Sequence, residues 1–114
     1  MRDVRELLAD ILEAIQHIEK YTGQGRGRFD TDELVQTWVI RHLQILGEAA
    51  RKLPPEIKER YSEVPWSKII GMRHILTHDY FDIDAEVVWA AVENDLPELK
   101  RQVEAIIKQL KVGP

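Results

Sequence analysis

The sequence predicts an all-α fold, an up-down bundle of four main helices with one additional short helical turn. Apolar residues recur at intervals of three and four along most of the chain, which is the spacing of one helix face. No stretch of four or more residues alternates between apolar and polar, so we expect no β-strand. Glycine or proline separates most of the periodic segments, which indicates where the helices end.

The first two helices are separated by a glycine-rich segment. The first is expected over residues 3–21, where leucine, isoleucine and valine repeat with helical spacing. Residues 22–28 (TGQGRGR) carry three glycines and interrupt this pattern. Asp30, followed three residues later by a glutamate, resembles a capping box, so the second helix should begin near Thr31. It should end at the proline pair that begins with Pro54.

The second half of the chain predicts two more main helices. A short helical turn is expected directly after the proline pair, and Pro65 then suits the first turn of a helix that runs to about His78. Asp82 and Asp84 offer N-caps for a last helix that fills most of the remaining chain. Pro97 lies inside this helix, so we expect a kink or a short break there.

Size and composition are those of one folded domain, which we expect to span residues 1–114. With 44% hydrophobic and 32% charged residues, the chain is neither disordered nor collagen-like. It contains no cysteine, which excludes disulfides and thiolate metal sites and is typical of a reducing cytoplasm. Its longest apolar run, VVWAAV at 87–92, is far shorter than the roughly 20 residues that span a bilayer, so we expect a cytoplasmic protein without a membrane segment. Because the net charge is -4, any contact with nucleic acid must use a local cationic patch.

The helix expected over residues 65–78 has two apolar sectors when its residues are placed at about 100° intervals. The sector that should meet the core contains Ile69, Met72, Ile75 and Leu76. Ile70 and Thr77 fall outside that sector, at about 100° and 80° from the first isoleucine. This second sector predicts a contact beyond the core, for which a partner subunit is the obvious candidate. Arg73 and His78 flank it.

The same helix carries two groups with the chemistry of RNA cleavage. Arg73 is a permanent cation whose planar fork matches phosphate oxygens, and His78 can move a proton near neutral pH. The histidine can take the proton of a 2′-hydroxyl or protonate the leaving oxygen, while the arginine stabilises the phosphorane without a metal. The residues alone leave two alternatives open. One is a surface salt-bridging Arg73 with a helix-terminal His78, and the other is a metal site at His74 and His78 completed by a nearby aspartate.

Arg73, His78 and Tyr80 have the spacing R-X4-H-X-Y, and other short motifs surround them in order. These motifs are LGEAA at 46–50, PW at 65–66, IIGMR at 69–73, YF at 80–81, VW at 88–89 and DLP at 95–97. The ordered set spans about residues 43–110 and resembles the HepT-like toxins, a branch of the HEPN superfamily. In close relatives the residue after the arginine is usually asparagine, whereas here it is His74, and its role stays open.

The resemblance implies an all-α HEPN bundle that forms a homodimer through the motif helix, so that two motifs meet at one cleft. It implies the toxin of a type VII-like toxin–antitoxin pair, a metal-independent endoribonuclease that needs no cofactor. Arg73 and His78 would then be catalytic, with His74 and Asp79 as supporting residues and RNA as the substrate.

The resemblance also implies a protein partner, a MntA-like nucleotidyltransferase antitoxin that transfers AMP to Tyr80. An AMP group would place an anion beside Arg73 and block the cleft by its bulk. The alternative outside the enzymes is a non-catalytic dimeric binding module that partners a minimal nucleotidyltransferase. Arg26 and Arg28 in the glycine-rich segment are expected to form a mobile cationic arm, and whether it contacts RNA, a partner or nothing is left open.

Overall fold

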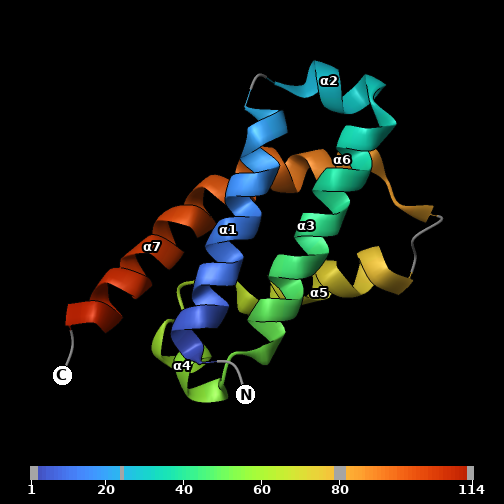
Figure 1. The fold of residues 1–114 in the computed structure, drawn as a ribbon. Coiled ribbons are helices and arrows are strands. Elements are labelled where there is room, and N and C mark those ends of the chain that lie inside the picture. Colours follow the sequence, from blue (N-terminus) through green and yellow to red (C-terminus); the bar gives the residue numbers. More distant parts are fainter. Residues whose placement is uncertain (1–2, 24, 79–81, 113–114) are drawn as a thin grey trace.

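The computed structural model describes residues 3–23, 25–78 and 82–112, which form helices and contain no strand (Figure 1). The helices in chain order are α1 (Val4–Thr22), α2 (Arg26–Thr31), α3 (Glu33–Lys52), α4 (Pro55–Arg60), α5 (Trp66–His78), α6 (Ala85–Ala90), the π-helical turn η2 (Ala91–Asp95) and α7 (Leu96–Val112). The all-α prediction is confirmed, with α1, α3, α5 and the α6–α7 segment as the main helical units. Within the described ranges, no helix is long and apolar enough to cross a membrane.

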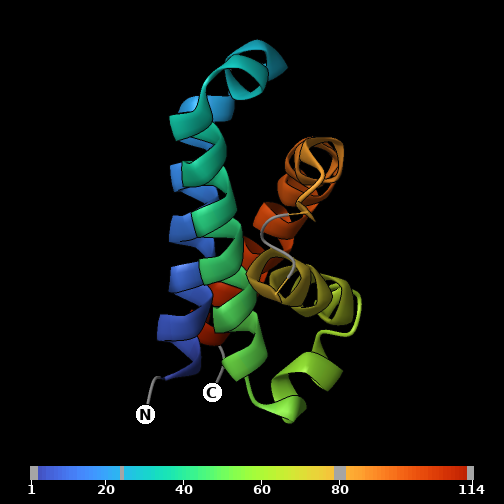
Figure 2. The same ribbon diagram turned by 90° about the vertical axis from the view of Figure 1, so that its right-hand side faces the viewer.

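One layer of the bundle is an antiparallel pair, α1 and α3, which lie side by side in both views (Figures 1 and 2). Their facing sides are apolar: Leu8, Ile15 and Ile18 of α1 and Val39 of α3 have no exposed surface. Burying such a side chain stabilises the fold by about 1.5–3 kcal/mol relative to leaving it in water. The buried apolar contact between α1 and α3 therefore stabilises this layer of the bundle.

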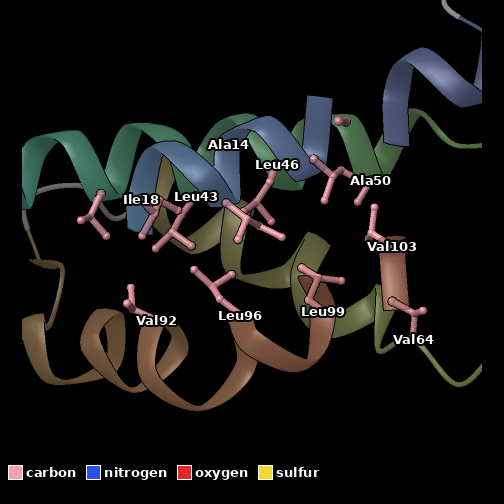
Figure 3. Close-up of a cluster of buried hydrophobic side chains, with 14 of the residues drawn as sticks. Ala14, Ile18, Leu43, Leu46, Ala50, Val64, Val92, Leu96, Leu99 and Val103 are labelled. Atoms are coloured by element: carbon pink, nitrogen blue, oxygen red, sulfur yellow. The ribbon is translucent and has the colours of Figure 1, made fainter. Parts of the chain in front are cut away.

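The second layer consists of α5 and the α6–α7 segment, which lie on the same side of the α1–α3 pair (Figure 2). Figure 3 shows the core between the layers, where Leu43 and Leu46 of α3 face Leu96 and Leu99 of α7. Each of these leucines is at most 5% exposed. The helix α3 is thus fixed from the α7 side, and it presents another part of its surface to α5.

The last predicted helix is interrupted close to Pro97, as expected. Asp84 caps α6 by accepting a hydrogen bond from the N–H of Glu86 at 2.9 Å. The interruption is the π turn η2, after which the N–H of Leu96 bonds to the carbonyl of Ala91, five residues back. Because proline has no N–H to donate, it is tolerated in the first turn of a helix, and Pro97 is the second residue of α7.

The glycine-rich segment differs from its prediction, because Arg26–Thr31 form the helix α2. Phe29 anchors this helix and is only 1% exposed. The Arg26 Nε lies 2.9 Å from Asp30 Oδ1, and its two terminal nitrogens donate to both carboxylate oxygens of Glu86 on α6. Sequence reasoning weighed the glycines and overlooked this one-turn ion pair and the buried phenylalanine. The prediction of a mobile cationic arm is therefore wrong.

The helix α3 begins two residues later than predicted. Its N-cap is Asp32 instead of Asp30, and the Asp32 carboxylate accepts a hydrogen bond from the N–H of Leu34 at 2.9 Å. The same carboxylate lies 3.8 Å from Arg28 Nε, and the Arg28 guanidinium lies 5.2 Å from the centre of the Tyr21 ring. Both arginines of the segment thus have local partners.

Candidate active site

The stem of Arg73 crosses α3 at a glycine. A Cβ atom placed on Gly47 would lie 2.3 Å from the Arg73 Cβ, 2.9 Å from its Cγ and 3.3 Å from the carbonyl oxygen of Ile69. No ordinary side chain fits at those distances, so the close approach of α3 and α5 depends on glycine at this position. The first atoms of the Arg73 side chain are fixed by this helix crossing.

The guanidinium of Arg73 is held by the next residue of α3. Its Nη2 lies 3.0 Å from Glu48 Oε2, and the two side chains are 28% and 30% exposed. Arg51 donates to the other oxygen of the same carboxylate at 2.7 Å. The hydrogen bond from Arg51 and the charge of Arg73 hold the pKa of Glu48 below its usual value. The carboxylate therefore keeps its charge and its hold on Arg73 at neutral pH, and loses them only as the pH falls through that lowered pKa.

Arg73 lines a cavity of about 450 Å³ between α1, α3 and α5. Glu48 of α3 and Thr77 of α5 also line this cavity. This volume lies in the range of sites that hold small molecules. The arginine is thus held in place beside a space that a phosphate group and part of a nucleotide can occupy.

His74 and His78 lie one turn apart on the exposed side of α5. Their ring centroids are 4.3 Å apart, with the ring planes inclined by 44°. The end of the helix is tied to α3, because the side-chain nitrogen of Gln44 donates to the carbonyl of Leu76 at 2.9 Å. This bond satisfies one of the carbonyls that a helix C-terminus leaves without an intrahelical partner. The carbonyl of Leu76, two residues before His78, is thus anchored to α3, the helix that also contacts Arg73.

Arg73 and His78 of one chain point in different directions. Five residues correspond to about 140° of rotation around an α-helix. In agreement, Arg73 contacts Glu48 on α3, whereas His78 is exposed and stacks on His74. One α5 helix therefore does not present both groups to a single phosphate from the same side.

The exposed face of α5 also differs from the helix-wheel prediction. Ile75, which was expected to meet the core, is 50% exposed, whereas Ile70, which was expected to meet a partner, is half-buried against the core. Trp66 explains the difference, because it lies about 60° from Ile69 on the same wheel and is only 6% exposed. It turns the buried sector of the helix toward Ile70. The large apolar side chain that α5 exposes is thus Ile75.

Two residues of the predicted site, Asp79 and Tyr80, lie outside the described residues. His74, the residue after Arg73, is exposed. Among the residues that the structure does describe, no three histidines, aspartates or glutamates stand close enough together to hold a metal ion. The metal alternative at His74 and His78 finds no third ligand within those ranges.

Sequence reasoning missed the partners of Arg73. Gly47 and Glu48 were noted only as part of the LGEAA motif at 46–50, and no role was assigned to them. A glycine inside a helix costs about 1 kcal/mol relative to alanine, so an interior glycine indicates close approach by another element. That signal was present at Gly47, but it does not reveal which element approaches.

A second set of residues is brought together without any sequence signal. The rings of His17 on α1 and His42 on α3 lie 4.8 Å apart. The Trp38 ring lies 4.4 Å from that of His42, and its Nε1 donates to the carbonyl of His17 at 2.7 Å. These rings join α1 to α3, which indicates a structural role.

The bundle thus holds an arginine beside an open cavity and exposes two histidines on the same helix. The family described as Ribonuclease HepT-like matches residues 11–106, a range that includes α3, α5 and η2. The chain therefore belongs to the HepT-like ribonuclease family of the HEPN superfamily.

Similar proteins carry ribonuclease names. A Thermococcus cleftensis protein named Probable ribonuclease HepT is 39% identical over 108 residues, which cover 94% of this chain and 98% of that protein. A protein of Caldanaerobacter subterraneus subsp. tengcongensis named Putative RNase is 36% identical over 112 residues, covering 97% of this chain and 100% of that one. The chain spans 50% of a longer Methanocaldococcus jannaschii protein named Gamma-glutamylcyclotransferase and putative RNase, with 39% identity over 110 residues. No solved structure matches with comparable significance.

Proposed function

We propose that this chain is a single-domain, metal-independent endoribonuclease in which Arg73 and His78 act on the phosphodiester. The observation that carries the proposal is the position of Arg73, which Gly47 and Glu48 hold beside an open cavity on the helix that exposes His78. The ribonuclease names of the relatives support RNA as the substrate. Cleavage of single-stranded RNA by the purified chain, and its loss in Arg73→Ala and His78→Ala, tests this proposal.

The chemistry needs one base, one acid and one cation. His78 takes the proton of the 2′-hydroxyl, and the 2′-oxygen attacks phosphorus. The bond from phosphorus to the 5′-oxygen breaks, and that oxygen leaves with a proton from a second imidazolium. Arg73 donates hydrogen bonds to the non-bridging oxygens, whose negative charge grows in the phosphorane. The products are a 2′,3′-cyclic phosphate and a 5′-hydroxyl.

A homodimer supplies what one chain lacks. One α5 does not turn Arg73 and His78 to the same side, and one chain offers a single His78 for two proton transfers. We infer that the exposed faces of two α5 helices meet, so that the partner's His78 completes the site. Ile75 supports this arrangement, since it is a large apolar side chain left half exposed on that face.

Ile75→Asp is expected to give a folded monomer that does not cleave RNA. The isoleucine is 50% exposed, so the change removes little from the core of the chain but places a charge in the dimer contact. Sedimentation at micromolar concentration measures the oligomeric state. Leu34→Asp is the matched control, because Leu34 is 81% exposed on another helix, α3. This variant protein should remain dimeric. A wild type that sediments as a monomer would refute the shared cleft.

We also propose that the chain is the toxin of a type VII-like pair and that a MntA-like nucleotidyltransferase silences it at Tyr80. The tyrosine oxygen would attack the α-phosphorus of ATP, with loss of its proton and release of pyrophosphate. The other two tyrosines are poorer acceptors. Tyr61 is only 5% exposed, with its hydroxyl buried, and Tyr21 packs edge-on against Trp38 beneath Arg28. Neither of them follows the Arg73–His78 pair in the sequence.

Tyr80→Phe is expected to stay folded and toxic when an active nucleotidyltransferase is co-expressed, because it keeps the ring but loses the acceptor oxygen. Intact mass of the wild-type chain should show an added AMP, and peptide mapping should place the adduct on the peptide that contains Tyr80. An adduct on Tyr21 or Tyr61 would refute this assignment. So would full neutralisation of Tyr80→Phe without any adduct, which would favour inhibition by binding alone.

A further inference from the structure

The cavity beside Arg73 continues along α3 in both directions from it. Arg41 and Lys52 line it as well, near opposite ends of its α3 wall. These two residues lie on the same face of the helix as Glu48, since they are separated from it by seven and four positions. Leu7, Ile45 and Ala49 are the apolar residues of the lining, and the polar Asp10, Gln44 and Thr77 complete it. We call this cavity the α3 groove.

The α3 groove carries cations that are available to an anion, although the chain as a whole has a net charge of -4. Glu48 neutralises much of Arg73 and Arg51 through close contacts. Arg41 is exposed and has no ion pair with any residue in the described ranges, and Lys52 reaches Glu48 only at 4.0 Å. Two cationic groups therefore flank Arg73 without a tightly bound carboxylate of their own.

The distances suit a chain of phosphates better than one phosphate. Eleven residues of α-helix separate Arg41 from Lys52, which is about 16 Å along the axis of α3. One phosphate group cannot contact both side chains at that separation, whereas successive phosphates of one strand can. Arg73 lies between them, because the residues it contacts on α3, Gly47 and Glu48, fall between positions 41 and 52.

We propose that the α3 groove is an RNA-binding track, in which Arg41 and Lys52 bind the phosphates on either side of the one that Arg73 contacts. This inference rests on the proposed ribonuclease function and adds to it the path of the single strand across α3. The planar fork of Arg41 binds two oxygens of one phosphate, and the ammonium of Lys52 acts as a point charge. The two residues position the substrate and take no part in proton transfer.

The experiment measures binding of a single-stranded 2′-O-methyl oligoribonucleotide, which the enzyme cannot cleave because the attacking hydroxyl is blocked. Affinity is determined over a series of salt concentrations for the wild type, Arg41→Gln and Lys52→Gln. The slope of log affinity against log salt is negative, and each lost phosphate contact makes it less steep by about 0.7 for a single strand. We expect each single variant to bind more weakly and with this less steep slope, and the slope of the double variant to change by about twice as much.

Arg101→Gln is the matched control. Arg101 is an exposed arginine on α7, outside the α3 groove, and it pairs with Glu98. It should leave both the affinity and the salt slope unchanged, and all variants should keep the thermal unfolding midpoint of the wild type. If Arg41→Gln and Lys52→Gln behave as Arg101→Gln does, the track is refuted.

Two further outcomes separate this inference from the function on which it rests. A wild type that cleaves RNA while neither variant changes binding would refute the track and leave the ribonuclease intact. A wild type that neither binds nor cleaves RNA would refute the function itself. If the variants keep their RNA affinity and lose only binding of the nucleotidyltransferase, the groove is a protein contact and the inference is overturned.

Discussion

Arg73→Ala and His78→Ala will each abolish most RNA cleavage. Loss of the histidine removes a positioned proton acceptor, which is worth about 10²- to 10⁴-fold in rate. Loss of the arginine removes a charged donor at the phosphorane, which is worth about 10²- to 10³-fold. Both should appear in kcat, measured as initial rates on a fluorescently labelled single-stranded RNA. The circular dichroism of both variants should match that of the wild type.

Two substitutions of the same kind elsewhere serve as controls. His17→Ala changes a histidine of α1, and Arg101→Ala changes an exposed arginine of α7. Both should keep nearly all of the wild-type rate, because neither residue contacts Arg73 or lines the cavity beside it. Wild-type rates in Arg73→Ala and His78→Ala would contradict the proposed catalysis. If cells that express the wild-type chain grow normally, and the chain still binds its nucleotidyltransferase, the non-catalytic binding module is favoured.

Gly47→Ala will destabilise the chain by about 1–3 kcal/mol, which is the usual cost of overpacking a contact between helices. The added methyl group would lie 2.3 Å from the Arg73 Cβ, so α3 and α5 must separate. Because the crossing also holds Arg73 against Glu48, we expect cleavage to fall more than stability alone explains. Chemical denaturation measures the free energy of unfolding, and the cleavage rate is compared under conditions in which the variant is fully folded.

Gly27→Ala is the control for this change. Gly27 lies in α2, and a Cβ atom placed on it meets nothing within 4 Å. Alanine there should leave cleavage unchanged and should stabilise the chain by up to about 1 kcal/mol through its helix propensity. Equal stability and equal cleavage in the two alanine variants would show that α3 and α5 do not need glycine at their crossing.

The helices that could be predicted from the sequence are those whose signals are local. The three-and-four spacing of α1 and the aspartate that caps α6 act within a few residues, so they can be seen in the sequence itself. The helix α2 could not be predicted, because its anchor Phe29 is buried by residues far away in the chain. In particular, Trp89 of the later helix α6 lies 5.4 Å from it.

In the candidate site, too, some residues could be predicted from the sequence and others depend on how the helices pack. Catalytic roles for Arg73 and His78 could be proposed from their chemistry on one helix together with the resemblance of the surrounding motifs to the HepT-like toxins. Gly47 and Glu48 could not be assigned, because their contacts with Arg73 depend on how α3 crosses α5. The exposure of Ile75 could not be predicted for a related reason: a helix wheel gives angles between side chains but does not fix which sector meets the core.

Cleavage in the presence of EDTA is the most direct test of whether Arg73 and His78 cut RNA without a metal. A single-stranded RNA of defined sequence is incubated with the purified chain and excess chelator, and the ends of the products are identified by mass spectrometry. We predict an unchanged rate, with 2′,3′-cyclic phosphate or its hydrolysis product at one end and a 5′-hydroxyl at the other. Cleavage that stops on chelation and returns with a divalent cation would contradict this mechanism and would make His74 and His78 metal ligands instead.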